Sequence, residues 1–269
     1  SVKSPINNFK ILFSAYVAEN CHKNTETLIY ELFRDIPILI YMACTKNTSI
    51  IFQNYSNYFG KNFLINYLGT ENIDNDIIEA FEKFLILHAE HEQNASTFIV
   101  QACEMTGSNL LNCMLAGVTA IEGNYHGGAS EQAFFQLQNC DNLEKLVECA
   151  KSNNCKIAGL GHRIYKAIDP RAAILKEMCE KINPGSVILQ RAINLENLIS
   201  KDEYFKTRKI FPNIDLYSGI FLESIGIPPN LFIMVFILAR FVGWIAHYKE
   251  IQSKKIKIIR PHQLYQFSD

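Results

Sequence analysis

Apolar residues recur every three or four positions along most of this chain, and few segments alternate with a period of two. A repeat of three to four places apolar side chains on one face of a helix, whereas a half-buried strand needs a period of two. The segment Cys155–Ala158 alone has strand character, and it is too short to form a sheet. The sequence therefore predicts an all-α fold.

The helical repeat is strong enough to delimit individual helices. The dipeptide Asp169-Pro170 marks one helix start, because proline suits the first helical turn. Pro37 falls inside another helical segment, and we expect it to interrupt that helix. The predicted helices are Thr25–Met42, Asp74–His88, Asn109–Ile121, Glu131–Leu137, Ala172–Ile182, Val187–Ile199, Ile214–Ile225 and Asn230–Tyr248.

The last of these segments, Asn230–Tyr248, is apolar almost throughout. Its uninterrupted apolar run ends at Arg240, short of the roughly 20 residues that a membrane span needs. We therefore expect a buried helix of a soluble protein. A guanidinium on such a helix must find an anion, because an isolated buried charge is very costly. Either a structural carboxylate or a bound substrate fills that role.

Charge and cysteine usage exclude several classes of protein. Lys and Arg total 26 against 27 Asp and Glu, so the chain lacks the basic surface typical of proteins that bind nucleic acids or anionic membranes. None of the 8 cysteines forms a Cys-x-x-Cys pair, which excludes zinc-ribbon and thioredoxin-like motifs. Scattered thiols are typical of a reducing compartment.

The first of three histidine clusters lies in the segment LHAEHEQNAST, residues 87–97. His88 and His91 are three residues apart on one predicted helix face, a spacing that suits a metal ion. The order is not His-Glu-x-x-His and no third ligand is placed nearby, so we expect no metal site. This polar segment is either the solvent-exposed end of a helix or part of the wall of a cleft.

The second cluster surrounds His126 in the segment GNYHGGA, residues 123–129. Flanking glycines allow the backbone to approach a ligand closely. The residues that follow look helical, and a helix N-terminus disfavours the charged imidazolium. A neutral imidazole at that place can donate a hydrogen bond to a carbonyl that is becoming an enolate. The alternative is a glycine turn that happens to contain a histidine.

The third cluster is the segment GLGHRIYK, residues 159–166, followed by Asp169-Pro170-Arg171. It is not a phosphate-binding loop of the Gly-Lys-Ser/Thr type. His162, Lys166 and Arg171 nevertheless form a compact set of donors for a carboxylate or a phosphate. A solvated basic turn is the alternative.

A lone acidic residue, Asp215, stands in the segment PNIDLYSG, residues 212–219. An aspartate before an apolar helix is usually an N-cap. If it faces a cleft instead, partial desolvation raises its pKa and makes it a base.

In their order along the chain, these motifs resemble those of citrate synthase. The matching segments are 87–96, 125–129, 159–165 with 169–171, 212–219, 239–240, 243–247 and 260–265. The residues of the first motif are similar to those of the bacterial form of the family. The resemblance runs from about Ile6 to about Tyr265, and the family's N-terminal portion is expected to be missing.

The resemblance implies a reaction, the condensation of acetyl-CoA with oxaloacetate to give citrate and CoA. Acetyl-CoA is then a co-substrate, and no cofactor is expected. Asp215 would remove a methyl proton, His126 would donate a hydrogen bond to the thioester oxygen, and His162 would polarise the ketone of oxaloacetate and supply a proton.

The resemblance also assigns binding residues. Forked guanidinium groups suit the two carboxylates of oxaloacetate, and Arg260 resembles an arginine that the family donates across its dimer. The oxaloacetate residues are His88, His162, Arg171, Arg240 and Arg260, and the CoA residues are Lys166, Ala158, Gly159 and Leu160.

The resemblance further implies a large helical domain, formed by residues 1–127 and 227–269, and a smaller mobile helical domain, residues 128–226. It predicts a homodimer or a dimer-based oligomer without nucleic-acid or membrane partners, located in the cytoplasm, or in the mitochondrial matrix if a leader has been removed.

Two alternatives to citrate formation stay open. 2-Methylcitrate synthase uses propionyl-CoA with the same residues, and one methylene group discriminates by only about 1–3 kcal/mol. A truncated, non-catalytic paralogue that acts as a partner subunit is the other. Without upstream helices, we expect exposed apolar side chains near the start of the chain, with Ile11, Leu12, Phe13, Tyr16 and Val17 as candidates.

Overall fold

The computed structural model describes residues 4–45, 58–123, 126–153 and 156–264. These residues form α-helices and one 3₁₀ turn, with no strand among them, so the all-α prediction is confirmed. Cys155 lies outside the described residues, and the rest of the strand candidate is irregular. The elements are α1 (Pro5–Asn20), α2 (Thr25–Thr45), α3 (Phe59–Leu68), α4 (Asn75–Ala89), α5 (Ala95–Glu104), α6 (Leu110–Ile121), α7 (Ala129–Gln138), α8 (Leu143–Asn153), α9 (Pro170–Ile182), α10 (Val187–Lys201), α11 (Glu203–Thr207), α12 (Asp215–Ser224), η1 (Pro229–Leu231) and α13 (Phe232–Lys254).

Side-chain caps explain where many of these helices begin. Such a cap accepts a hydrogen bond from a backbone N–H that the first helical turn leaves without a partner, and each is worth about 1 kcal/mol. Asp169 caps α9, whose first residue is Pro170, as the sequence predicted. The other capping side chains are Asp74, Asn94, Asn109, Ser186 and Asp202.

The prediction that Pro37 interrupts its helix is wrong. The helix α2 continues from Thr25 to Thr45 with Pro37 inside it. A proline removes one backbone hydrogen bond and crowds the preceding turn. Here the buried side chains of Leu32, Ile36 and Ile40 lie on both sides of Pro37, and we attribute the continuity to their packing in the core.

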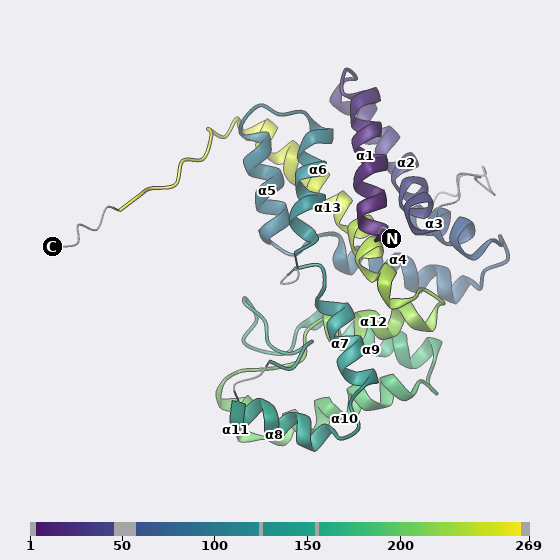
Figure 1. Ribbon diagram of the computed structural model, residues 1–269, viewed down its shortest axis with the longest axis vertical. Coiled ribbons are helices and arrows are strands. Elements are labelled where there is room, and N and C mark those ends of the chain that lie inside the picture. The colour runs from purple at the N-terminus through teal and green to yellow at the C-terminus, as the bar shows by residue number, and fades with distance from the viewer. Residues whose placement is uncertain (1–3, 46–57, 124–125, 154–155, 265–269) are drawn as a thin grey trace.

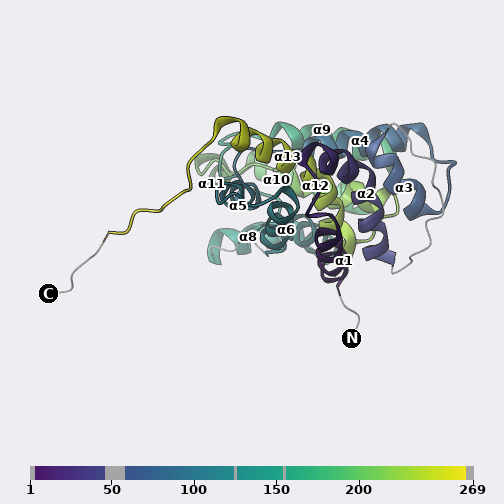
Figure 2. The same ribbon diagram turned by 90° about the horizontal axis from the view of Figure 1, so that it is seen from above.

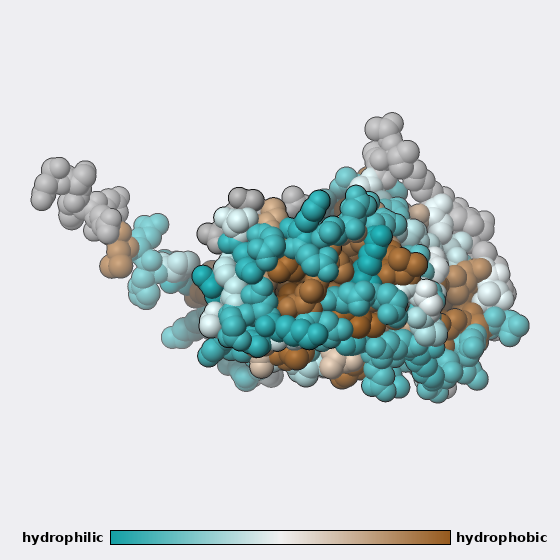
Figure 3. All heavy atoms as spheres, turned by 90° about the horizontal axis from the view of Figure 1, so that it is seen from below, coloured by the Kyte–Doolittle hydropathy of each residue, from teal (hydrophilic) through white to brown (hydrophobic). Residues whose placement is uncertain are grey.

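The helices form two groups. Figure 1 shows α1–α6 and α13 in the upper part of the molecule and α7–α11 in the lower part, with α12 near their junction. The helix α12 packs against α4 through the stacked rings of Phe221 and Phe84, whose centroids are 5.3 Å apart. Gly219 permits close contact with α7 and α13, because a Cβ atom there would lie 2.7 Å from Phe232. Seen from below, the lower group is mainly hydrophilic around a hydrophobic area near its middle (Figure 3).

The apolar segment near the C-terminus is a core helix. By length and composition Pro229–Lys254 is apolar enough to cross a membrane, but 72% of its most apolar window is buried within the fold. The side chain of Trp244 is fully buried, and Gly117 of α6 lies so close that a Cβ atom would be 3.1 Å from that indole. The expectation of a buried helix is confirmed.

The first helix is better covered than the sequence suggested. Phe13 and Val17 of α1 are buried, so the expectation that they are exposed is wrong. The Phe13 ring stacks on Phe9 and meets Phe241 of α13 edge-on, with a centroid distance of 5.5 Å in each case. Ile11, on the opposite face of α1, is 55% exposed.

Candidate active site

A cleft of 720 Å³ collects most of the predicted site residues. Its walls come from the α4–α5 loop, the turn before α7, the loop before α9, the first residues of α12 and one face of α13. Of the predicted residues it contains His88, His126, His162, Arg171, Asp215 and Arg240, together with His91, Gln93, Asn94, Ala95, Phe98, Ala129, Arg163, Ile164, Ile214 and Phe236.

Asp215 is the first residue of α12 and does not cap it. Other side chains bond the N–H groups at the start of that helix: Asp169 Oδ2 accepts from Ile214 N at 3.2 Å, and Asn213 Oδ1 accepts from Asp215 N at 2.9 Å. The carboxyl group of Asp215 therefore stays available to the cleft. Burial raises its pKa to about 6, against the lowering effect of Arg171, which is the environment of a general base.

The hydrogen bonds of His162 define its tautomer. Its Nδ1 accepts hydrogen bonds from the backbone N–H groups of Ile164 and Tyr165, both at 3.1 Å. Because Nδ1 is an acceptor, the single proton of the neutral ring is on Nε2. Burial lowers the pKa of His162, partly opposed by Asp169, and so favours this neutral form. His162 thus presents a neutral N–H donor.

His126 lies in the turn before α7, and Ser96 holds one of its ring nitrogens. His126 Nε2 is 2.8 Å from Ser96 Oγ. Burial lowers the pKa of His126 to about 4. Trp244 Nε1 also donates to Ser96 Oγ, at 3.3 Å, and the Ser96 hydroxyl donates to Asn94 Oδ1 at 2.9 Å. With its one proton given to Asn94, Ser96 Oγ accepts from His126 Nε2–H; if the hydroxyl turns to Nε2 instead, the ring proton of neutral His126 is on Nδ1.

Two arginines supply positive charge to the cleft in different ways. The guanidinium of Arg171 forms a two-point pair with the buried Asp169, at 3.0 and 2.8 Å. Arg240 is only 3% exposed, and its Nε donates to the His88 carbonyl oxygen at 2.9 Å. Its buried NH1 has no hydrogen-bond partner among the described residues. Burial lowers the pKa of Arg240 to about 10, so the group stays charged at neutral pH and lacks a directly bonded anion.

The two histidines of the first motif are not on one helix face, and they differ in their availability. The helix α4 ends at Ala89, so His88 is helical and His91 lies in the loop. His88 Nδ1 donates to the Phe84 carbonyl oxygen at 2.8 Å, and Nε2 is 3.0 Å from Ser218 Oγ. With both nitrogens bonded to protein and the pKa lowered to about 3 by burial, His88 is a supporting group.

His91 instead presents an unbonded ring nitrogen to the cleft. The sequence did not predict His91 as a substrate-binding residue. Its buried Nε2 has no hydrogen-bond partner among the described residues. The ring lies against His162 and Tyr165, with centroid distances of 5.0 and 5.2 Å. The signal was present in the sequence: Asn94 is a good N-cap, and a helix beginning there requires a break before it.

Several predicted binding residues lie outside this cleft. Lys166 is exposed, and Ala158, Gly159 and Leu160 form the loop before His162, with the Ala158 N–H already bonded to Gln136 Oε1 at 2.8 Å. Arg260 is exposed in an extended segment, residues 256–264, that leaves the body of the molecule (Figures 1 and 2). None of these residues lines the cleft that holds Asp215, although Gly159 packs against Leu216 at the start of α12.

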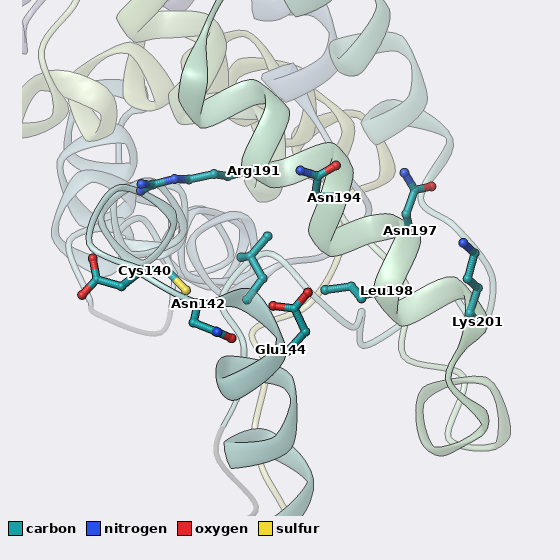
Figure 4. Close-up of a pocket in the computed structure, with 10 residues that line it drawn as sticks. Cys140, Asn142, Glu144, Arg191, Asn194, Asn197, Leu198 and Lys201 are labelled. Carbon is teal, nitrogen blue, oxygen red and sulfur yellow. The ribbon is translucent and has the colours of Figure 1, made fainter.

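A second cavity of 480 Å³ lies where α10 faces the start of α8 (Figure 4). Arg191 at its edge is a structural residue, because its NH1 donates to the carbonyl oxygens of Leu137 and Gln138 at 2.8 and 2.7 Å. None of the predicted site residues lines this cavity.

Comparisons with known proteins agree with the motifs and the fold. The family model described as "Citrate synthase, C-terminal domain" matches residues 3–262. Among solved structures, the citrate synthase of the thermophilic archaeon Thermoplasma acidophilum, in a ternary complex with carboxymethyl coenzyme A and oxaloacetate, is 26% identical, with a TM-score of 0.86 over 99% of this chain and 74% of that chain.

Two further citrate synthase structures are equally similar. The enzyme of Thermotoga maritima is 31% identical, with a TM-score of 0.84 over 98% of this chain and 72% of that one. The enzyme of Pyrobaculum aerophilum is 28% identical, with a TM-score of 0.86 over 99% and 72%. With a family match over nearly its whole length, the same helical fold and the motif residues gathered in one cleft, this chain belongs to the citrate synthase family.

Proposed function

We propose that this chain condenses acetyl-CoA with oxaloacetate and water to form citrate and CoA. The observation that carries the proposal is the meeting, in one cleft, of a carboxyl group with a raised pKa, two neutral histidines and a buried guanidinium without an anion. These are the groups needed to form an enol and to add it to a keto dicarboxylate. No cofactor takes part in this chemistry, because acetyl-CoA is a co-substrate.

The first step is enolisation of acetyl-CoA. Asp215 removes a proton from the methyl group, and electron density moves to the thioester oxygen. In this step the Ser96 hydroxyl turns from Asn94 Oδ1 to His126 Nε2, 2.8 Å away, and His126 Nδ1–H donates a hydrogen bond to the thioester oxygen. The N–H group of a neutral imidazole stabilises the negative charge that develops on the thioester oxygen by donating a hydrogen bond to it.

The second step forms the new carbon–carbon bond. The enol carbon attacks the ketone carbon of oxaloacetate, and His162 Nε2–H donates its proton to the ketone oxygen; the proton that Asp215 took from the methyl group then restores neutral His162. Arg171 and Arg240 bind the two carboxylates, and His91 Nε2 supplies a further hydrogen bond. Water then cleaves the thioester of the citryl-CoA intermediate, which releases citrate and CoA.

We further propose that two copies of the chain complete each site. Arg260 lies outside its own cleft, on an exposed extended segment. A second copy can present this arginine to the cleft, as the resemblance predicts. Lys166 and the loop Ala158–Leu160 remain the proposed CoA contacts, and residues 1–127 with 227–269 and residues 128–226 remain the proposed large and small domains.

The proposed reaction predicts release of a free thiol that requires both substrates. We expect the purified chain to release CoA from acetyl-CoA only when oxaloacetate is present, and to release it more slowly from propionyl-CoA. A steady-state thiol assay with product identification measures both rates. A higher kcat/KM with propionyl-CoA would identify a 2-methylcitrate synthase, and thiol release from neither thioester would contradict the proposed activity.

The raised pKa of Asp215 predicts the acid limb of the pH profile. A general base must be ionised, so activity is expected to be present at neutral pH and to be lost as the pH falls through about 6. The pKa of about 4 keeps His126 neutral in this range, and burial also lowers the pKa of His162 from its usual value. Measuring kcat/KM for acetyl-CoA from about pH 5 to about pH 8 tests this assignment. A rate that stays constant through pH 6 would contradict it.

A further inference from the structure

Asn213 joins the two segments that carry Asp215 and His162. Its side-chain amide donates from Nδ2 to the Gly161 carbonyl oxygen at 2.7 Å, and its Oδ1 accepts from the Asp215 N–H at 2.9 Å. Asn213 lies two residues before Asp215, and Gly161 immediately precedes His162. One side-chain amide therefore bonds to the backbone of Asp215 and to the backbone of the residue before His162.

Backbone hydrogen bonds extend this connection on both sides. The Asn213 N–H donates to the Gly159 carbonyl oxygen at 2.9 Å, and the Gly161 N–H donates to the Phe211 carbonyl oxygen at 2.7 Å. The two segments thus run against each other in an antiparallel bridge between Leu160 and Pro212. The side chain of Asn213 adds two hydrogen bonds to this backbone contact.

The close contact between these two segments requires the glycines of the His162 loop. Gly159 and Gly161 have φ values of +79° and +78°, a region that L-residues with side chains rarely adopt. A Cβ atom on Gly159 would lie 2.8 Å from Leu216 Cα. The loop is therefore seated directly on the first turn of α12, and Asn213 bonds to it at that contact.

We propose that Asn213 is a positioning residue that sets the placement of His162 relative to Asp215. The inference rests on the proposed function, in which the base and the ketone donor act on the two reactants that form one bond. Displacing reacting groups by about 1 Å costs on the order of 10²-fold in rate. Asn213 is not among the residues that line the cleft, so its removal is expected to leave Arg171 and Arg240, which bind the oxaloacetate carboxylates, in place.

A serine at this position separates positioning from simple capping. Like asparagine, serine accepts a hydrogen bond from the N–H two residues on, but its shorter side chain cannot also donate to Gly161. We expect Asn213→Ser to lower kcat by about 10- to 10²-fold, with the KM for oxaloacetate within about twofold of the wild-type value and little change in melting temperature.

Asn109→Ser is the matched control. Asn109 caps α6 through a hydrogen bond from Asn112 N at 3.0 Å, away from the cleft, so the same substitution there is expected to leave kcat unchanged. Wild-type kcat in Asn213→Ser would overturn the proposal. A rise in the KM for oxaloacetate with unchanged kcat would overturn it as well, because it would make Asn213 a binding residue.

An activity-independent measurement keeps this test separate from that of the proposed function. Amide hydrogen exchange of Gly161, measured against amides of α10, reports whether the loop stays seated on α12. We expect exchange at Gly161 to be at least about tenfold faster in Asn213→Ser than in the wild type. Unchanged exchange would overturn the positioning role, whether or not the wild-type chain forms citrate.

Discussion

Replacing Asp215 with Asn is expected to lower kcat by about 10²–10⁴-fold, the usual effect of removing a general base. The amide keeps the shape of the side chain but cannot accept the methyl proton of acetyl-CoA. Oxaloacetate affinity is expected to stay within a few-fold, because Arg171, Arg240 and His91 are untouched. Steady-state kinetics and calorimetric titration with oxaloacetate measure the two quantities separately.

Asp76→Asn is the control for this substitution. Asp76 also lies in the first turn of a helix, α4, but it is exposed and pairs with Lys181 at 2.9 Å outside the cleft. We expect its replacement to leave kcat unchanged. If Asp215→Asn also keeps wild-type turnover, the base is another group.

Replacing Arg240 with Leu is expected to weaken oxaloacetate binding by about 30- to 5,000-fold, which corresponds to a loss of about 2–5 kcal/mol for one partner of a buried charge pair. The melting temperature is expected to change little. In the free protein the guanidinium has one bond, from Nε to the His88 carbonyl oxygen, and an unpartnered NH1. Its removal therefore breaks no hydrogen-bonded ion pair, although it takes positive charge away from Glu90 and Asp215.

Arg191→Leu is the control, and we expect it to affect stability and not oxaloacetate binding. Its NH1 holds two carbonyl oxygens at the C-terminal end of α7 and lies outside the cleft. We expect this variant to lower the melting temperature and to keep oxaloacetate affinity. Calorimetry and thermal melting on the same samples distinguish the two arginines. If Arg240→Leu melts far below the wild type and still binds oxaloacetate, the arginine is a structural ion partner, whose loss typically costs about 3–5 kcal/mol.

Local rules predicted much of the fold. The N-caps Asp169 and Asn109 and the first-turn proline of α9 act through neighbours in the sequence, so their positions can be read without a structure. The continuity of α2 through Pro37 cannot be read in this way, because it depends on packing between distant segments. The buried face of α1 is of the same kind, since Phe13 is covered by Phe241 of α13.

The sequence indicated which segments carry the candidate site residues, but not which side-chain atoms face the cleft. His88 and His91 both fit a helical spacing, and only the end of α4 at Ala89 shows that His91 turns into the cleft while His88 bonds to Phe84 and Ser218. The link between Asn213 and Gly161 spans 52 residues of sequence. Contacts of this range depend on the fold, and no local pattern contains them. The role of Arg260 remains a prediction that depends on a second copy of the chain.

The most direct test of the proposed reaction follows the methyl protons of acetyl-CoA. The chain is incubated with oxaloacetate and acetyl-CoA that is fully deuterated at the methyl group, and the mass of the product is measured. If one deuteron is removed by Asp215 before the carbon–carbon bond forms, the citrate retains two deuterons, and Asp215→Asn yields product at a rate about 10²–10⁴-fold lower. Absence of citrate, or equal rates of its formation by the wild type and Asp215→Asn, would contradict the account.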